Sequence, residues 1–134
     1  MKTNFYYPAI FQKEKKGYSV TFADIPEIDT QGDSLEEAIE MAKDALGLYL
    51  TDLIEDNKEL PQETKEIENI ILKKNQILVL VEFDFVEYNK KVNNKCVKKT
   101  LSIPSWLNVL AENESINFSQ VLQEALKIKL NILK

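Results

Sequence analysis

The 134-residue sequence contains no histidine and no arginine, and Cys96 is its only cysteine. The absence of histidine excludes Ser–His and Cys–His nucleophile pairs and removes a usual ligand of zinc sites. A lone cysteine cannot close an internal disulfide, which fits a reducing compartment. Carboxylates and lysines remain for catalysis, but the composition favours a protein that is not an enzyme and needs no cofactor.

The sequence also lacks long apolar runs. No stretch approaches the roughly 18 apolar residues of a membrane span, and the N-terminal segment MKTNFYYPAIFQKEKK lacks the apolar core of a signal peptide. Hydrophobic residues make up 44% of the chain and charged residues 29%, which is typical of a soluble globular protein. We therefore expect a cytoplasmic protein with no membrane partner.

Charge divides the sequence into an acidic and a basic part. Residues 1–86 contain 18 acidic residues against 9 lysines, a net charge of −9. Residues 87–134 contain 8 lysines against 4 acidic residues, a net charge of +4. This division suggests two partners of opposite charge, and nucleic acid is the obvious partner of the basic part. The alternative is that both surfaces are simply solvated.

Alternating apolar residues predict strands near the N-terminus. A period of two over residues 5–11 predicts the first strand, and Pro8 within it indicates an edge position. The charged segment 13–17 is typical of a hairpin turn, and the alternation resumes in a return strand at 18–22. A short extended segment is expected around residues 28–31.

A long helix and a further strand follow. Ser34 and Glu37 have the spacing of a capping box, so we expect a helix over 35–56 with one apolar stripe. Residues 67–72 fit a strand or a helix, and a turn at 73–75 follows them. The continuous apolar run at 76–85 is typical of a central strand covered on both faces. Together these elements predict an α+β module, a small sheet with one long helix packed on it.

The composition changes after this strand. Residues 87–95 are polar and rich in lysine, which indicates a linker between an N-terminal module at 1–86 and a C-terminal segment at 96–134. Within that segment, Leu101 and Ile103 alternate with polar residues as in a short strand.

Two short helices are expected after that strand. Pro104 suits the first turn of the first helix, and residues 113–115 end it. Asn117, with Gln120 three residues later, predicts the capped start of a second helix of about 14 residues.

A strand and two short helices of this size cannot bury their apolar faces alone. Pairing with a second copy solves this, because the two strands form an antiparallel ribbon and the helices interlock. We therefore predict a ribbon-helix-helix homodimer, whose shared core comprises Leu101, Ile103, Trp106, Leu110, Val121, Leu122 and Leu126.

A two-stranded ribbon fits the major groove of DNA, and its outer face would carry Lys98, Thr100 and Ser102 toward base edges. The backbone N–H groups at the start of the second helix would bind phosphate, at Asn117, Phe118 and Ser119. The alternative is a dimerisation arm with a polar outer face.

Both parts of the chain resemble one family. VKKTLSIPSWLNVLAENESINFSQVLQEALK is similar to the ribbon-helix-helix tail of HicB-type antitoxins, and YPAIFQKEKKGYSVTFADIPEIDTQGDSLEEAIEMAKDALGLYL resembles their N-terminal module. The resemblance implies a partial ribonuclease-H-like module that masks a small mRNA-cleaving toxin, HicA. It also implies a tail that binds operator DNA and represses the operon. Some members carry a helix-turn-helix tail, but the KTLSIP strand favours the ribbon.

An acidic module can compete for the basic, RNA-binding surface of a ribonuclease. The candidate toxin-binding residues lie on the acidic face of the predicted helix: Glu36, Glu40, Asp44 and Asp52. The loop at 24–33 is a second candidate. The alternative for these carboxylates is an ordinary solvated face.

Two other functions stay open at this point. Asp24, Glu82 and Asp84 could gather a divalent metal for hydrolysis, if the fold brought them together. The chain could also be a stand-alone dimeric repressor whose N-terminal module senses a ligand. The operator sequence and any assembly beyond the dimer are not determined by the residues.

Overall fold

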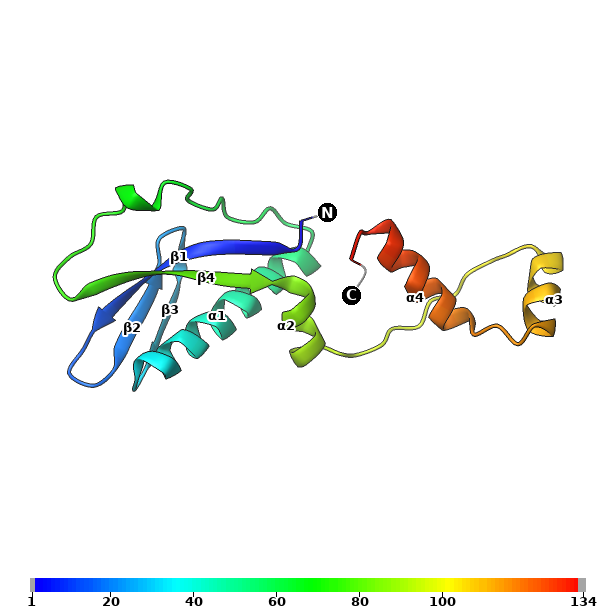
Figure 1. Ribbon diagram of the computed structural model, residues 1–134, viewed down its shortest axis with the longest axis horizontal. Coiled ribbons are helices and arrows are strands. Elements are labelled where there is room, and N and C mark those ends of the chain that lie inside the picture. The colour runs from blue at the N-terminus through cyan, green and yellow to red at the C-terminus, as the bar shows by residue number, and fades with distance from the viewer. Residues whose placement is uncertain (1, 133–134) are drawn as a thin grey trace. The chain divides into compact units, whose positions relative to one another are not determined.

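The computed structural model describes residues 2–132 and has an α+β fold (Figure 1). Its strands and helices are, in chain order, β1 (Asn4–Lys13), β2 (Tyr18–Phe22), β3 (Ile25–Gly32), α1 (Leu35–Glu55), the 3-10 turn η1 (Ile67–Asn69), β4 (Gln76–Asp84), α2 (Phe85–Val92), α3 (Ser105–Asn113) and α4 (Phe118–Lys129). The chain divides into two compact units, Lys2–Asn94 and the residues from Lys95 onward.

The four strands form one antiparallel sheet in the order β3-β2-β1-β4. The predicted hairpin between β1 and β2 is confirmed: the Glu14 N–H donates to the Gly17 carbonyl at 3.1 Å, and Gly17 has a φ of 76°. A Cβ atom at Gly17 would be 1.9 Å from the Gly32 carbonyl oxygen, so this turn requires glycine.

Helix α1 packs on one face of the sheet and completes the core. The Ser34 side chain accepts a hydrogen bond from the Glu37 N–H at 3.1 Å, which confirms the predicted helix start. The buried hydrophobic residues come from all four strands and from α1: Phe5, Tyr7, Ala9, Phe11, Val20, Phe22, Ile25, Ile28, Ala38, Ala42, Leu46, Leu50, Val81 and Phe83.

The edge position predicted for Pro8 is wrong, because β1 pairs with both β2 and β4. The Pro8 carbonyl accepts from the Ala23 N–H at 3.1 Å, beyond the last residue of β2. Because the N–H and C=O of one residue in an antiparallel strand point the same way, the missing N–H of Pro8 also faces the place where β2 has ended. An inner strand therefore accommodates this proline without losing a ladder bond.

The central position predicted for residues 76–85 is also wrong. β4 lies at the edge of the sheet beside β1, with no other strand of residues 2–132 next to it, and α1 covers one face. On that face Val81 and Phe83 are buried, whereas Leu80 on the opposite face is 43% exposed. The apolar composition of a central strand is thus present at an edge.

The segment between α1 and β4 runs back along the sheet (Figure 1). Its residues 67–72, which fitted a strand or a helix, form the short turn η1 and irregular structure. The Tyr6 N–H donates to Glu63 at 2.7 Å, and the Thr64 N–H donates to Asp24 at 2.8 Å. The first bond satisfies a backbone N–H of β1 beyond the end of β2, and the second ties the segment to the turn between β2 and β3.

The linker predicted at 87–95 is wrong in its first part, where residues up to Val92 form α2. The Asp84 side chain caps this helix by accepting from the Glu87 N–H at 3.1 Å. Tyr88 packs on the hydrophobic core, and its ring contacts Phe83 at a centroid distance of 5.9 Å. Only one face of this helix is apolar. Its segment is therefore polar and rich in lysine on average, which is also typical of a linker.

The C-terminal unit contains α3 and α4. The predicted break between them is confirmed at Ser115, which has a φ of 54°. The Asn117 side chain accepts from the Gln120 N–H at 3.1 Å and so caps α4, as predicted. Residues 93–104 form no strand in the single chain, and a strand requires a neighbouring strand to bond.

Candidate interaction surfaces

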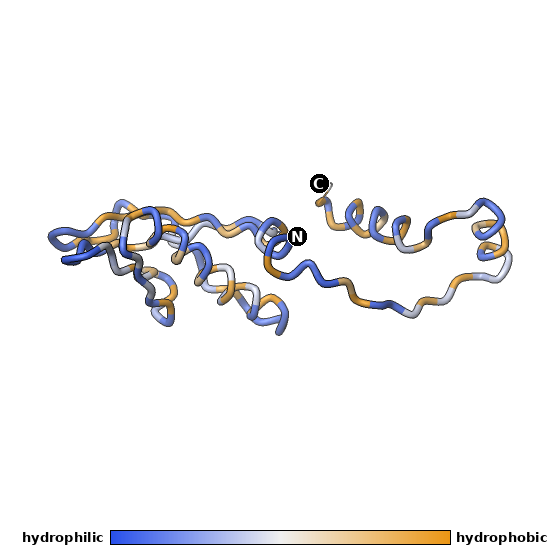
Figure 2. Tube along the Cα trace, turned by 90° about the horizontal axis from the view of Figure 1, so that it is seen from below, coloured by the Kyte–Doolittle hydropathy of each residue, from blue (hydrophilic) through white to orange (hydrophobic). Residues whose placement is uncertain are grey.

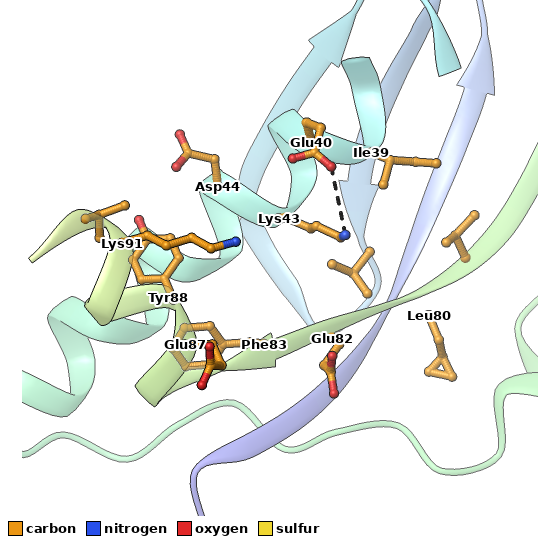
Figure 3. A pocket seen from close by; sticks show the side chains of 13 residues that line it. Ile39, Glu40, Lys43, Asp44, Leu80, Glu82, Phe83, Glu87, Tyr88 and Lys91 are labelled. Atoms are coloured by element: carbon orange, nitrogen blue, oxygen red, sulfur yellow. Dashed lines mark ion pairs between the residues drawn. The ribbon is translucent and has the colours of Figure 1, made fainter. Parts of the chain in front are cut away.

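A groove of about 510 Å³ lies between α1, β4 and α2 (Figure 3). Its lining residues are Ile39, Glu40, Lys43, Asp44, Val79, Leu80, Val81, Glu82, Phe83, Glu87, Tyr88, Lys91 and Val92. The floor is apolar and the rim is charged, which is the usual composition of a surface that binds a partner.

The rim of this groove is acidic. Four carboxylates stand against two lysines, and Lys43 is already paired with Glu40 at 3.9 Å. Glu82 accepts hydrogen bonds from the side chains of Asn4 and Tyr6, both at 3.0 Å. A basic partner group would therefore meet a net negative field here.

Tyr88 forms part of the groove wall. Its burial, followed by the nearby charges of Asp44 and Asp52, raises the pKa of the Tyr88 hydroxyl. The side chain offers an apolar ring face with a hydroxyl donor, a combination enriched at protein interfaces.

The four toxin-binding residues predicted from the sequence are all exposed on α1, but they are not equivalent. Glu40 and Asp44 line the groove, whereas Glu36 and Asp52 do not. The sequence singles out Glu82 only as a possible metal ligand and not as part of this surface, because its strand is predicted to be covered on both faces. Sequence reasoning missed Glu87, Tyr88 and Lys91, because α2 was read as a linker.

The residues predicted to gather a metal are each engaged in separate contacts. Asp24 binds Thr64 through the N–H and the hydroxyl, Glu82 binds side chains of β1, and Asp84 caps α2. Within residues 2–132 no group of three or more Cys, Asp or Glu side chains could hold a metal ion. The structure therefore gives no support to metal-dependent hydrolysis.

The C-terminal unit exposes its apolar residues. Figure 2 shows hydrophobic positions recurring along α3 and α4. Of the predicted dimer core, Trp106 is 65% exposed, Leu110 56%, and Leu101 61%. Ile103, Val121 and Leu126 are exposed as well, and Leu122 is half-buried. None of residues 95–132 is buried, so the single chain has no core in this unit.

The predicted DNA-contacting residues fall into two groups. Lys98, Thr100 and Ser102 are exposed in the extended segment before α3. Asn117 caps α4, while Phe118 and Ser119 line an apolar groove together with Leu101 and Ile103. The extended segment and the start of α4 therefore lie close together within this unit.

Comparison with known proteins decides the family. A model of the HicB-like antitoxins of bacterial toxin–antitoxin systems matches residues 6–127. This chain belongs to that family.

One curated relative and two solved structures are similar to this chain. Antitoxin HicB 2 of Photorhabdus laumondii is 44% identical over 61 residues, which cover 46% of this chain and 44% of that protein. A chain of a toxin–antitoxin complex from Streptococcus pneumoniae has a TM-score of 0.55 and 31% identity, covering 94% of this chain and 99% of that one. The antitoxin HicB of Burkholderia pseudomallei has the same fold, with a TM-score of 0.54, 22% identity and coverage of 97% and 99%.

The HicB-like family assignment agrees with the observed α+β fold. The matched segment spans less than half of the Photorhabdus relative.

No helix in the described range 2–132 is both long and apolar enough to cross a membrane.

Proposed function

We propose that this chain is the antitoxin of a toxin–antitoxin pair and that its N-terminal unit neutralises a small HicA-type mRNA-cleaving toxin. The observation that supports this most directly is the acidic groove between α1, β4 and α2, in a part of the chain with a net charge of −9 over residues 1–86. The similar Streptococcus structure is itself a toxin–antitoxin complex.

Neutralisation would work by competition for one surface. A ribonuclease binds RNA through basic side chains, and a complementary acidic surface both attracts such a protein and covers those side chains. Glu40, Asp44, Glu82 and Glu87 supply the charge, while Tyr88 and the exposed side of β4 supply apolar contact area.

The second part of the proposal is autoregulation by a cytoplasmic ribbon-helix-helix homodimer bound to operator DNA. The C-terminal unit has no buried residue among residues 95–132 of the single chain, yet its helix α4 is capped by the Asn117 side chain. A second copy would supply the missing core and the neighbouring strand for residues 95–103. Its two-fold symmetry would match a palindromic site.

The charge of the C-terminal unit supports the DNA partner. Residues 95–134 contain six lysines against three acidic residues, a net charge of +3. Lys98, Thr100 and Ser102 would point from the paired ribbon into the major groove. Asn117, Phe118 and Ser119 would bring the start of α4 to a phosphate.

Co-purification of the full chain with the product of the small reading frame beside its gene tests the proposal. We expect a stable complex in which the partner no longer cleaves RNA. The same purified protein should also bind DNA that carries the operon's promoter. The full chain is used because a truncation after residue 86 would cut α2, which begins at Phe85. Promoter binding without any protein partner would favour the stand-alone repressor instead.

A further inference from the structure

The two edges of the sheet are protected differently. The outer strand β3, IPEIDTQG, carries Pro26, Glu27 and Asp29, which discourage pairing with another strand. The other outer strand β4, QILVLVEFD, contains neither proline nor lysine and pairs with β1 in unbroken register. A long hydrophobic edge of this kind is a template for a further strand.

The backbone of β4 is available for such pairing. The Phe85 N–H donates to the Thr3 carbonyl and the Asn75 carbonyl accepts from Lys13, so the odd-numbered residues of this strand face β1. By the alternation of an antiparallel ladder, Leu78, Leu80 and Glu82 direct their N–H and C=O groups to the outer side.

The groove runs along this outer side. Its lining includes Val81 and Phe83 from the helix-covered face of β4 and Leu80 and Glu82 from the opposite face. Figure 3 shows Lys43 between α1 and β4, while Leu80 and Glu82 project on the other side of the strand. A hollow lined by both faces of one strand follows the edge of that strand.

Charge decides which occupant fits. The groove has four carboxylates against two lysines and lies in a strongly acidic unit. A second copy would bring two such edges together and place like charges opposite each other, which is unfavourable. A basic segment would instead pair with Glu40, Asp44, Glu82 and Glu87.

We propose that the partner toxin adds an extended, lysine- or arginine-bearing segment to β4 as a fifth strand, with its basic side chains over the groove. The inference rests on the proposed function and specifies how the toxin binds. Strand addition places main-chain hydrogen bonds at the edge and leaves specificity to the flanking side chains. It also explains why β4 has the sequence of a central strand, since the partner covers its free edge in the complex.

The variant Leu80→Pro tests the backbone bonds. Its lost N–H faces outward, so the bonds between β4 and β1 stay intact, and edge strands tolerate proline at such positions. With the adjacent gene product as probe, we expect Leu80→Pro to bind at least about 10-fold more weakly, a loss of about 1.4 kcal/mol. The matched variant Leu80→Ala also loses the leucine side chain but keeps the N–H, so Leu80→Pro should bind at least about threefold more weakly than Leu80→Ala, a difference of roughly 0.7 kcal/mol.

Amide hydrogen exchange of the unmodified chain gives a second readout, independent of any effect of proline on folding. In the toxin complex the N–H groups of Leu78, Leu80 and Glu82 should exchange more slowly than in the free chain. Unchanged exchange at these three positions, or wild-type affinity in a folded Leu80→Pro variant, would overturn the proposal. A change in oligomeric state with unaltered toxin affinity would assign the edge to a second copy and also contradict it.

The charge of the occupant is tested with Asp44→Lys, with Glu55→Lys as control, because Glu55 is exposed on α1 but does not line the groove. We expect Asp44→Lys to weaken binding and Glu55→Lys to change it little, and equal effects would argue against a basic segment in the groove. If the unmodified chain does not bind the toxin at all, the proposed function itself fails. If it binds normally while Leu80→Pro has no effect, only strand addition fails.

Discussion

The ring of Tyr88 in α2 lies directly against the backbone of Gly47 in α1. A Cβ atom built on Gly47 would be 2.2 Å from Tyr88 Cε1, far inside van der Waals distance. This contact holds α2 against the core and thereby forms one wall of the groove. It also explains a glycine in the middle of a 21-residue helix, where glycine costs about 1 kcal/mol relative to alanine.

The effect of Gly47→Ala on the free energy of unfolding should therefore change sign when Tyr88 is removed. In the wild-type background the substitution should destabilise the N-terminal unit by about 1–3 kcal/mol, because the tightly packed ring must move. In a Tyr88→Ala background the same change should stabilise the unit by about 1 kcal/mol through helix propensity. Urea unfolding followed by circular dichroism measures both. A stabilising effect in both backgrounds would mean that the contact carries no constraint.

The stability of the N-terminal unit should fall at high pH through Tyr7. Burial, followed by the charges of Glu63 and Asp24, raises the pKa of the Tyr7 hydroxyl to about 12, and the hydroxyl donates to the Pro61 carbonyl at 2.7 Å. The folded state holds this proton more tightly than the unfolded state. Its contribution is therefore complete below about pH 10 and is lost as pH rises toward 12, a change of about 2 kcal/mol.

Tyr7→Phe isolates that effect. It removes the ionisable hydroxyl and costs about 1 kcal/mol at neutral pH through the lost hydrogen bond. Between pH 9 and pH 12 the wild type should lose about 2 kcal/mol more stability than Tyr7→Phe, measured by urea unfolding and circular dichroism. Parallel losses in the two proteins would show that Tyr7 is not the responsible group.

Leu110→Lys should prevent dimerisation. Leu110 is 56% exposed in the single chain and belongs to the predicted dimer core, where a lysine would be buried without a partner. Analytical ultracentrifugation should show a monomer, and the emission of the only tryptophan, Trp106, should shift to the red. Leu48→Lys is the matched control, since Leu48 is 59% exposed in α1, outside the C-terminal unit. A dimer retained by Leu110→Lys would contradict the predicted core.

Lys98→Gln should weaken binding to the operon's own promoter by about 1–3 kcal/mol, because a lysine that contacts a base edge is lost from each chain of the ribbon. Fluorescence anisotropy at fixed ionic strength measures this, and Lys15→Gln, an exposed lysine of the β1–β2 turn, is the control. The same loss on unrelated DNA would assign Lys98 to phosphate contact, whereas no loss would remove it from the interface.

Local signals in the sequence predicted several elements well. The caps at Ser34 and Asn117, the turn at Gly17 and the break at Ser115 involve residues close together along the chain. Their geometry is therefore set by hydrogen bonds and backbone preferences that a few neighbouring residues determine. The exposure of Glu40 and Asp44 was predicted in the same way, because the apolar stripe of α1 determines which of its residues face the solvent.

The candidate groove was predicted only in part because it depends on packing between distant segments. Phe85–Val92 are polar on average, although Asp84 and Glu87 have the spacing of a helix cap. The contact of Tyr88 with Gly47 and Phe83 is what places this helix against the core. Glu82 and Glu87 reach the groove through the pairing of β4 with β1 and the capping of α2 by Asp84. None of these relationships leaves a periodic signal in the sequence.

The sequence by itself determined the family, the two oppositely charged parts and the starts of α1 and α4, because motifs, charge and caps are local properties of the chain. Only the tertiary structure decided that Pro8 lies in an inner strand and that β4 lies at an edge. A strand's side-chain pattern reports how apolar its surroundings are but not which strand supplies its neighbour. The pairing of strands depends on hydrogen bonds between residues far apart in the sequence. For β4 this pairing leaves the backbone groups of its outer side without a neighbouring strand among the described residues.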